Sequence, residues 1–271
     1  MPRLSVITPT YNQAEFIEDT IKSVLSQSFE DFEYIIVDSC SDDGTEEIVR
    51  KYEKKDPRIL YIREKDRGQA DGINKGLRRA KGDVVCWINS DDMYFDKNVF
   101  KKAIKAFESR GAGLVLGDAW YCDREGKFTE YSPSDRKGGD WLIKRWYYIV
   151  QPSCFWINRG KLLDTSYDFA FDWKFFAGLF DTEKKVFIHE PLSIYRMYDD
   201  NKTGLDNAAR RKEIWRLKDE FASSKADIYW SRELYRIYKK AEKTGNDGLK
   251  RRADLISRIL FHISGRRIAG F

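Results

Sequence analysis

Short apolar runs alternate with amphipathic segments through the first hundred residues of the chain. The apolar runs predict four strands: Leu4–Thr8, Phe32–Asp38, Ile59–Ile62 and Val84–Asn89. Three helices are predicted between them: one carrying Ile17, Ile21, Val24 and Leu25, one over Thr45–Lys54, and one from Gly68 to about Gly82. Each connection is long enough to return the next strand parallel to the last. The pattern therefore predicts an α/β fold with a Rossmann-like, mostly parallel sheet.

The pattern changes from Gly113 onward. Short aromatic-rich strands are predicted there: Leu114–Tyr121, Phe128–Tyr131, Cys154–Ile157 and Val186–Ile188. Glycine, proline and charged residues separate them, which favours a mixed half of the sheet. After about Asp206 the sequence becomes strongly charged and helical, with two or three helices. We predict one domain over 1–205, with halves 1–112 and 113–205, and a helical extension over 206–271.

Composition narrows the class of protein. The chain has 271 residues, 42% of them hydrophobic, which suits one enlarged core. Its 49 basic and 44 acidic residues are nearly balanced, so the net charge of +5 predicts no nucleic-acid partner. Four separated cysteines suit reduced thiols in a cytoplasmic protein, and no apolar run approaches the roughly 18 residues that a membrane span needs. We expect a protein that touches a membrane without crossing it.

Polar residues end three of the predicted strands, at Thr8–Asn12, Asp38–Thr45 and Asn89–Asp92. Ligands of open α/β sheets bind outside the carboxyl ends of the strands, so these segments predict one binding crevice. The adjacent carboxylates of Asp91 and Asp92 repel each other unless a cation or hydrogen-bond donors stabilise them, and Mg²⁺ or Mn²⁺ is the natural cation. The alternative is a turn in which Asp92 or Asp96 caps the following helix.

Four motifs in order resemble family 2 glycosyltransferases of the GT-A fold: Thr8–Asn12, Ile36–Thr45, Gly68–Gly76 and Trp87–Tyr94. Three more extend the resemblance to about Gly204: Gln151–Trp156, Phe169–Phe176 and Pro191–Arg196. The resemblance implies an inverting enzyme of polysaccharide biosynthesis that moves a sugar, of UDP-hexose type, from a nucleotide-diphosphate sugar to a hydroxyl. The acceptor is then a glycan or a lipid-linked molecule, 1–112 is the nucleotide-binding half, and 113–205 is the acceptor half.

The resemblance also implies roles for residues on the donor side. The implied donor-binding residues are Thr8, Tyr11, Asp38, Asp71, Asn74, Lys75, Asn89 and Ser90. The family's Asp-x-Asp metal motif begins with Asn89 here, so Asp91 is the implied ligand of a divalent metal, with Asp92 as a weaker second. Ser39 stands where the family often has a further acidic residue. The alternative for Asp71–Lys75 is an ordinary surface helix.

On the acceptor side, the resemblance implies Asp172 as the base that removes the proton of the acceptor hydroxyl. The aromatic neighbours of Asp172 are expected to exclude water from its carboxylate. The alternative is that Asp172 is the N-cap of a helix whose buried face follows it. Gln151 and Trp173 are expected on the acceptor side. A lid is expected over Met197–Thr203 with Arg196, Tyr198 and Lys202 as its functional residues; Tyr198 stands where related sequences often have histidine.

Two further alternatives stay open at this stage. A nucleotidyltransferase shares an α/β sheet and an acidic metal site, and a non-catalytic nucleotide-sugar binding module shares the crevice. No Gly-x-Gly-x-x-Gly follows the first strand, and the chain has no Gly-x-x-x-x-Gly-Lys-Ser/Thr loop, which disfavours dinucleotide and P-loop sites. Residues 249–268 combine an apolar helical face with basic flanks. They predict peripheral membrane contact, or a helix that packs on its own domain.

Overall fold

The computed structural model describes residues 3–134, 147, 149–199, 201–202 and 208–222, together with scattered positions between 229 and 252. The chain forms two compact units. The first comprises 1–136 and 149–206, and the second comprises 137–148 and 207–271. All the candidate site residues described below belong to the first unit.

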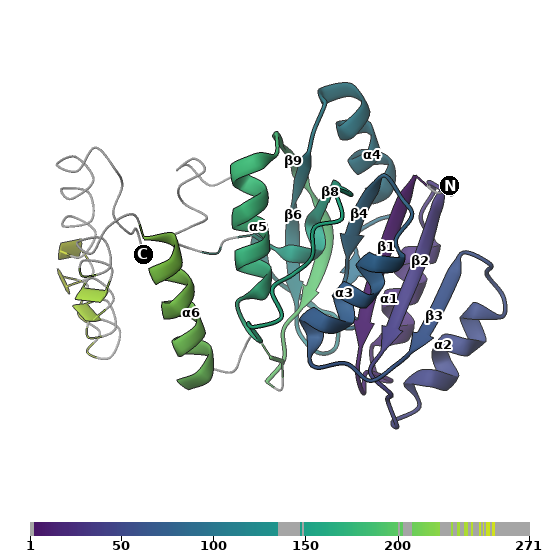
Figure 1. The fold of residues 1–271 in the computed structure, drawn as a ribbon, viewed down its shortest axis with the longest axis horizontal. Helices are drawn as coiled ribbons and strands as arrows, with labels where there is room; N and C mark the ends of the chain where they lie inside the picture. The colour runs from purple at the N-terminus through teal and green to yellow at the C-terminus, as the bar shows by residue number, and fades with distance from the viewer. Residues whose placement is uncertain are drawn as a thin grey trace. The chain divides into compact units, whose positions relative to one another are not determined.

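One mixed sheet forms the centre of the first unit (Figure 1). Its parallel part has the order β3-β2-β1-β4, built from β1 (Leu4–Thr10), β2 (Phe32–Asp38), β3 (Ile59–Arg63) and β4 (Val84–Trp87). This arrangement confirms the predicted Rossmann-like half. Because these strands are parallel, their carboxyl ends meet at one edge of the sheet.

The other part of the sheet is mixed, as the sequence predicted. It contains β5 (Met93–Tyr94), β6 (Leu114–Cys122), β7 (Phe128–Ser132), β8 (Cys154–Ile157) and β9 (Lys185–Arg196). Strand β8 runs antiparallel to both β4 and β6, whereas β9 runs parallel to β6. The sheet therefore continues from the first half of the domain into the second.

Strand β9 is much longer than the predicted Val186–Ile188. It continues past Pro191 to Arg196 through a register shift opposite Asp118 of β6. Proline and a bulge interrupt the alternation of apolar and polar residues that marks a strand, so the sequence pattern did not predict the second half of β9. This half carries the chain to the candidate site.

Helices cover both faces of the sheet. In the first unit they are α1 (Ile17–Leu25), α2 (Thr45–Glu53), α3 (Gln69–Arg79), α4 (Val99–Arg110), α5 (Phe171–Thr182) and the short 3-10 helix η2 (Gln151–Ser153). The second unit contains α6 (Ala208–Phe221). Ile7 and Trp87 are register partners, so their side chains point to the same face of the sheet. On this face Gly76 of α3 lies against Ile7, and Phe176 of α5 packs on Trp87. Tyr94 contacts Cys86 and Phe100 of α4 on the other face.

None of the helices among the described residues is long and apolar enough to span a bilayer. Within the predicted membrane-contact segment 249–268, the structure describes only 249, 251 and 252, which are helical. The remainder of that prediction lies outside the described residues. The same holds for Thr203 at the end of the predicted lid.

Candidate active site at the carboxyl edge of the sheet

The loops that follow β1 and β2 are joined by hydrogen bonds. The backbone N–H of Asn12 donates to Ser41 Oγ at 2.8 Å, and the N–H of Asp42 donates to Asn12 Oδ1 at 3.1 Å. Asn12 and Cys40 hold left-handed backbone, with φ of 51° and 62°. Such strain costs on the order of 1 kcal/mol at each residue and concentrates at functional sites. The two strand ends thus form one preorganised surface.

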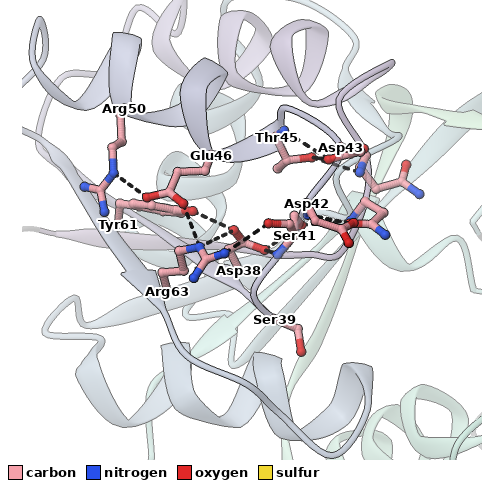
Figure 2. A network of polar contacts seen from close by, with 12 residues as sticks. Asp38, Ser39, Ser41, Asp42, Asp43, Thr45, Glu46, Arg50, Tyr61 and Arg63 are labelled. Atoms are coloured by element: carbon pink, nitrogen blue, oxygen red, sulfur yellow. Dashed lines mark hydrogen bonds and ion pairs between the residues drawn. The ribbon is translucent and has the colours of Figure 1, made fainter.

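Asp38 lies at the centre of a polar network beneath this surface (Figure 2). Its side chain is fully buried. Oδ1 accepts hydrogen bonds from the N–H and hydroxyl of Ser41, at 2.9 and 2.6 Å, and Oδ2 accepts one from the Tyr61 hydroxyl at 2.6 Å. Burial, reinforced by Asp38, raises the pKa of Tyr61. Arg63 forms an ion pair with Glu46 and donates a hydrogen bond to the carbonyl of Ser41. Asp38 therefore holds the loop after β2 in shape.

The residues predicted on β1 lie in different surroundings. Thr8 is fully buried and its hydroxyl is paired with the Tyr34 hydroxyl at 3.0 Å, whereas Tyr11 is 61% exposed at the strand end. Thr10 lies within the Thr8–Asn12 motif but was not among the predicted donor-binding residues; it is the register partner of Asp38. Its buried hydroxyl has no hydrogen-bond partner in the described part of the chain. Thr10 and Tyr11 therefore present polar groups at this edge. The sequence alone could not predict this unpaired hydroxyl, because the pairing of Thr10 with Asp38 arises only when β1 and β2 come together in the sheet.

The carboxylate of Asp92 is an internal anchor of the loop after β4. Asp92 is 1% exposed; Oδ1 accepts the N–H of Arg196 at 3.0 Å, and Oδ2 accepts the amide of Asn89 at 3.2 Å. Burial, followed by the charge of Asp91, raises the pKa of Asp92 well above its ordinary value. The alternative helix cap is wrong for Asp92, because β5 separates it from α4, whose N-cap is Asn98.

Asn89 links this anchor to α3. Its Oδ1 accepts a hydrogen bond from Gln69 Nε2 at 2.9 Å, while its amide N–H donates to Asp92. An ionised aspartate at position 89 has no proton to donate to Asp92. This geometry gives a physical reason for asparagine at the first position of the Asp-x-Asp motif. Gln69 itself was not singled out by the sequence.

We expect Asn89→Ala to lower the free energy of unfolding by about 1–3 kcal/mol, because it leaves the buried Asp92 Oδ2 and the Gln69 amide without their partner. Gln69→Ala should cost less, since it removes one hydrogen bond from the far side of Asn89. Urea denaturation of both variants and the double variant gives the coupling energy. If the stability losses of Asn89→Ala and Gln69→Ala simply add in the double variant, the two side chains are not energetically coupled, and the expectation is wrong.

Asp91 is the more accessible carboxylate of the pair. Its Oδ2 accepts a hydrogen bond from the Tyr198 hydroxyl at 2.9 Å, and its carbonyl accepts one from Arg196 Nε at 3.1 Å. Burial raises the pKa of Asp91, and the bond from Tyr198 opposes that effect. Ser90 is 5% exposed in the same loop. The loop after β4 thus presents the Asp91 carboxylate, and Tyr198, just after β9, holds it by a hydrogen bond.

A divalent ion fits this arrangement as a partner shared with phosphate. Among the described residues no three His, Cys, Asp or Glu side chains form a cluster able to hold a metal by themselves. Mg²⁺, however, is usually held by one or two carboxylates together with substrate phosphates and waters. Asp91 can supply that single carboxylate, while both oxygens of Asp92 already accept protein hydrogen bonds.

The other predicted residues of α3 are bonded to parts of the chain other than the Asp91 loop. Asn74 is 2% exposed, and its side-chain amide exchanges two hydrogen bonds with the backbone of Leu163, at 2.9 and 2.8 Å. Lys75 binds the carbonyl of Lys65 and the carboxylate of Glu64. Asp71 accepts the N–H of Arg67. In this conformation the three side chains therefore hold neighbouring backbone in place, and their role in donor binding stays a prediction.

Asp172 lies in the first turn of α5, where an acidic side chain is favoured by the helix dipole. The N-cap is Ala170, so the alternative of Asp172 as N-cap is wrong in position. Its Oδ1 accepts the N–H of Trp173 at 2.7 Å. Burial raises the pKa of the Cys154 thiol, and the negative charge of Asp172 adds to that rise.

The buried face of α5 fixes the position of Asp172. Phe175 and Phe176 pack against Trp87 of β4 and Trp156 of β8, with ring centres 5.3–6.0 Å apart. Trp173 is 6% exposed, so it also belongs to the buried part of the helix. The predicted buried helical face is confirmed.

Gln151 lies just before β8, at the end of β4. Its Nε2 donates to the carbonyl of Trp87 at 2.6 Å, while its buried Oε1 accepts no hydrogen bond from the described residues. The arrangement brings an amide oxygen to the carboxyl end of β4. Its predicted position on the acceptor side stays a prediction.

The segment after β9 contacts both sides of the site. Tyr198 binds Asp91, and the ammonium group of Lys202 lies 5.3 and 5.8 Å from the ring centres of Phe169 and Phe171. Arg196, 4% exposed, binds the carbonyls of Asp91 and Arg124. The predicted lid residues are therefore brought beside the Asp91 loop and the start of α5.

Solved structures share this fold. The S. aureus TarS fragment 1–349 in complex with UDP-GlcNAc superposes with a TM-score of 0.67 at 20% identity, covering 85% of this chain and 70% of that one. The mannosyltransferase PcManGT from Pyrobaculum calidifontis, in complex with GDP-Man and Mn²⁺, gives a TM-score of 0.54 at 18% identity and covers 88% and 64%. The curled, mostly parallel sheet with its helices is the GT-A fold of glycosyltransferases.

Sequence comparison identifies the family. The profile described as Glycosyl transferase family 2 matches residues 5–200, and the chain belongs to that family. The putative teichuronic acid biosynthesis glycosyltransferase TuaG of Bacillus subtilis is 42% identical over 132 residues, 45% of this chain and 52% of TuaG. The GalNAc(5)-diNAcBac-PP-undecaprenol beta-1,3-glucosyltransferase of Campylobacter jejuni is 30% identical over 210 residues, 73% and 66% of the two chains. The matched segments thus span about half to two-thirds of these relatives.

Proposed function

We propose that this protein is an inverting glycosyltransferase that moves a hexose-type sugar from a nucleotide-diphosphate donor, of UDP type, to a hydroxyl of a glycan or lipid-linked acceptor. The observation that carries the proposal is the convergence of three polar strand ends at one edge. The loops after β1 and β2 are joined at Asn12 and Ser41, and the loop after β4 presents Asp91. This is the edge at which open α/β sheets bind their ligands.

On the donor side, Asp91 would hold a divalent cation, Mg²⁺ or Mn²⁺. When bound, such an ion supplies neutralisation of the charge that develops on the leaving nucleoside diphosphate. The preorganised surface of Thr10, Tyr11 and the loop held by Asp38 would bind the nucleoside. The Mn²⁺ and GDP-Man in PcManGT and the UDP-GlcNAc in TarS support a nucleotide-sugar donor and a metal for this fold.

On the acceptor side, Asp172 would accept the proton of the attacking hydroxyl. Inversion requires that hydroxyl to approach from the face opposite the leaving group, so the base has to be separate from the donor-binding loops. Asp172 meets this requirement because it stands on α5, which packs over β4 and β8. The names of the C. jejuni and B. subtilis relatives support a lipid-linked or cell-wall glycan as the acceptor class.

A thermal-shift screen tests the proposal. UDP-, GDP- and dTDP-sugars are each added with Mg²⁺, Mn²⁺ or EDTA, because a ligand that binds the folded state raises the unfolding midpoint, and at equal concentration a tighter ligand raises it more. We expect UDP-sugars with a divalent ion to give the largest rise. The best donor is then incubated without acceptor, and release of UDP is measured. No stabilisation by any nucleotide sugar would reject the proposal.

A further inference from the structure

Tyr198 contacts the carboxylate to which the proposed function assigns the metal. The phenol hydroxyl donates to Asp91 Oδ2 at 2.9 Å, across 107 residues of sequence. A hydroxyl bonded to one oxygen of a carboxylate fixes the rotation of that carboxylate and directs its other oxygen. The bond therefore determines how Asp91 faces a ligand at the strand end.

The ring of Tyr198 is itself held in place. Its centre lies 5.1 Å from that of Phe16, and the guanidinium of Arg124 lies 5.4 Å from the Tyr198 ring centre. Arg124 makes a two-point ion pair with Glu15, and Arg196 lies over the other ring, 4.7 Å from the centre of Phe16. Tyr198 therefore reaches Asp91 from a stack of aromatic and cationic groups, which limits its rotamers.

We propose that Tyr198 is a positioning residue for the cation site: its hydroxyl holds Asp91 Oδ2 so that Oδ1 faces the divalent ion. This inference rests on the proposed function. It gives Tyr198 a role distinct from that of a metal ligand, since a neutral phenol binds Mg²⁺ or Mn²⁺ poorly compared with a carboxylate. Arg196 supports the same loop through the Asp91 carbonyl and the backbone bond to Asp92.

The bond also connects the cation site to the segment that follows β9. Tyr198 lies two residues after the end of β9, and Lys202 of the same segment reaches the aromatic rings at the start of α5. The described residues of this segment thus contact both the Asp91 loop and the aromatic residues at the start of α5. Loss of the hydroxyl is therefore expected to weaken cation binding first and to affect turnover only below cation saturation.

Tyr198→Phe tests the inference, because it removes the hydroxyl and retains the ring. Binding of Mn²⁺ is measured by electron paramagnetic resonance, first with the protein and Mn²⁺ alone and then with UDP added. We expect the dissociation constant for Mn²⁺ to rise by about 10-fold, the lower end of the range for groups that orient metal ligands. In transfer assays the apparent KM for Mn²⁺ should rise by a similar factor, with kcat at saturating Mn²⁺ nearly unchanged.

Tyr195→Phe is the matched control, because Tyr195 lies on β9 and packs on Tyr121 with ring centres 5.4 Å apart. It should bind Mn²⁺ as the wild type does, and circular dichroism should show that both variants are folded. Unchanged or tighter Mn²⁺ binding by Tyr198→Phe would overturn the inference while leaving the proposed function intact. Failure of the wild-type protein to bind Mn²⁺ with UDP would instead reject the proposed metal dependence itself.

Discussion

Replacing Asp91 with alanine is expected to abolish metal-dependent transfer, with a loss of at least about 100-fold in kcat/KM, because the leaving diphosphate loses its charge neutralisation. One side-chain oxygen of Asp91 accepts the Tyr198 hydroxyl, whereas both oxygens of Asp92 accept hydrogen bonds from Asn89 and Arg196. The loss should be larger than that of Tyr198→Phe, since the alanine variant removes the ligand and the tyrosine variant only its orientation. Stopped assays of UDP release at several Mn²⁺ concentrations measure kcat/KM for both variants.

The control for Asp91 is Asp83→Asn, at the opposite end of the same strand. Asp83 is exposed and pairs with Arg3, an ion pair of the surface type that contributes about 0–1 kcal/mol. This variant should keep wild-type kinetics. Asp91→Ala should also lose the extra thermal stabilisation that Mn²⁺ provides to the UDP-bound wild type. Unaltered kinetics in Asp91→Ala would remove the residue from the site.

Asp172→Asn is expected to lower kcat by about 100-fold or more while leaving donor affinity nearly unchanged, because a general base contributes roughly 10² to 10⁴ to the rate. The amide keeps the size of the side chain and can still accept the hydrogen bond from Trp173. It has no charge with which to take the acceptor proton. Initial rates at saturating donor and acceptor, together with calorimetric titration of UDP, separate the two quantities.

Asp181→Asn provides the matched control on the last turn of the same helix, where the side chain is exposed. It should change neither kcat nor donor affinity. A parallel loss of UDP binding in Asp172→Asn would indicate a structural role at the start of α5. Wild-type turnover would assign the base to another residue.

The parallel half of the fold was predictable because its strands are short, apolar and bounded by polar residues. Phe32–Asp38 was predicted to the residue, and Leu4–Thr8 falls within β1. The two-residue strand β5 and the second half of β9 were not predictable. Strand β5 pairs with β9, as Met93 with Ile194, and the second half of β9 also pairs with β6, as Ala119 with Ser193, so both depend on partners distant in sequence. Pro191 also breaks the pattern within β9.

The candidate site was predictable only in outline. The position of Asn89–Asp92 at a strand end follows from the sequence, but the inward direction of Asp92 and the outward direction of Asp91 do not. Those directions are set by Arg196 and Tyr198, which lie more than 100 residues away in sequence. Asn74 resembles a ligand-binding amide in the motif, yet its side-chain nitrogen and oxygen each bond to the backbone of Leu163. Partners distant in sequence decide which polar side chains remain available.

The left-handed loop after β2 has a consequence for following ligand binding in solution. Cys40 is partly exposed there, whereas the other three cysteines are buried, and burial raises the pKa of Cys86 to about 12 and of Cys122 to about 11. Thiolates are the reactive form, so a maleimide fluorophore should label Cys40 selectively. The dye would then stand two residues from Asp38 and report nucleotide binding through its emission, with no substitution in the chain.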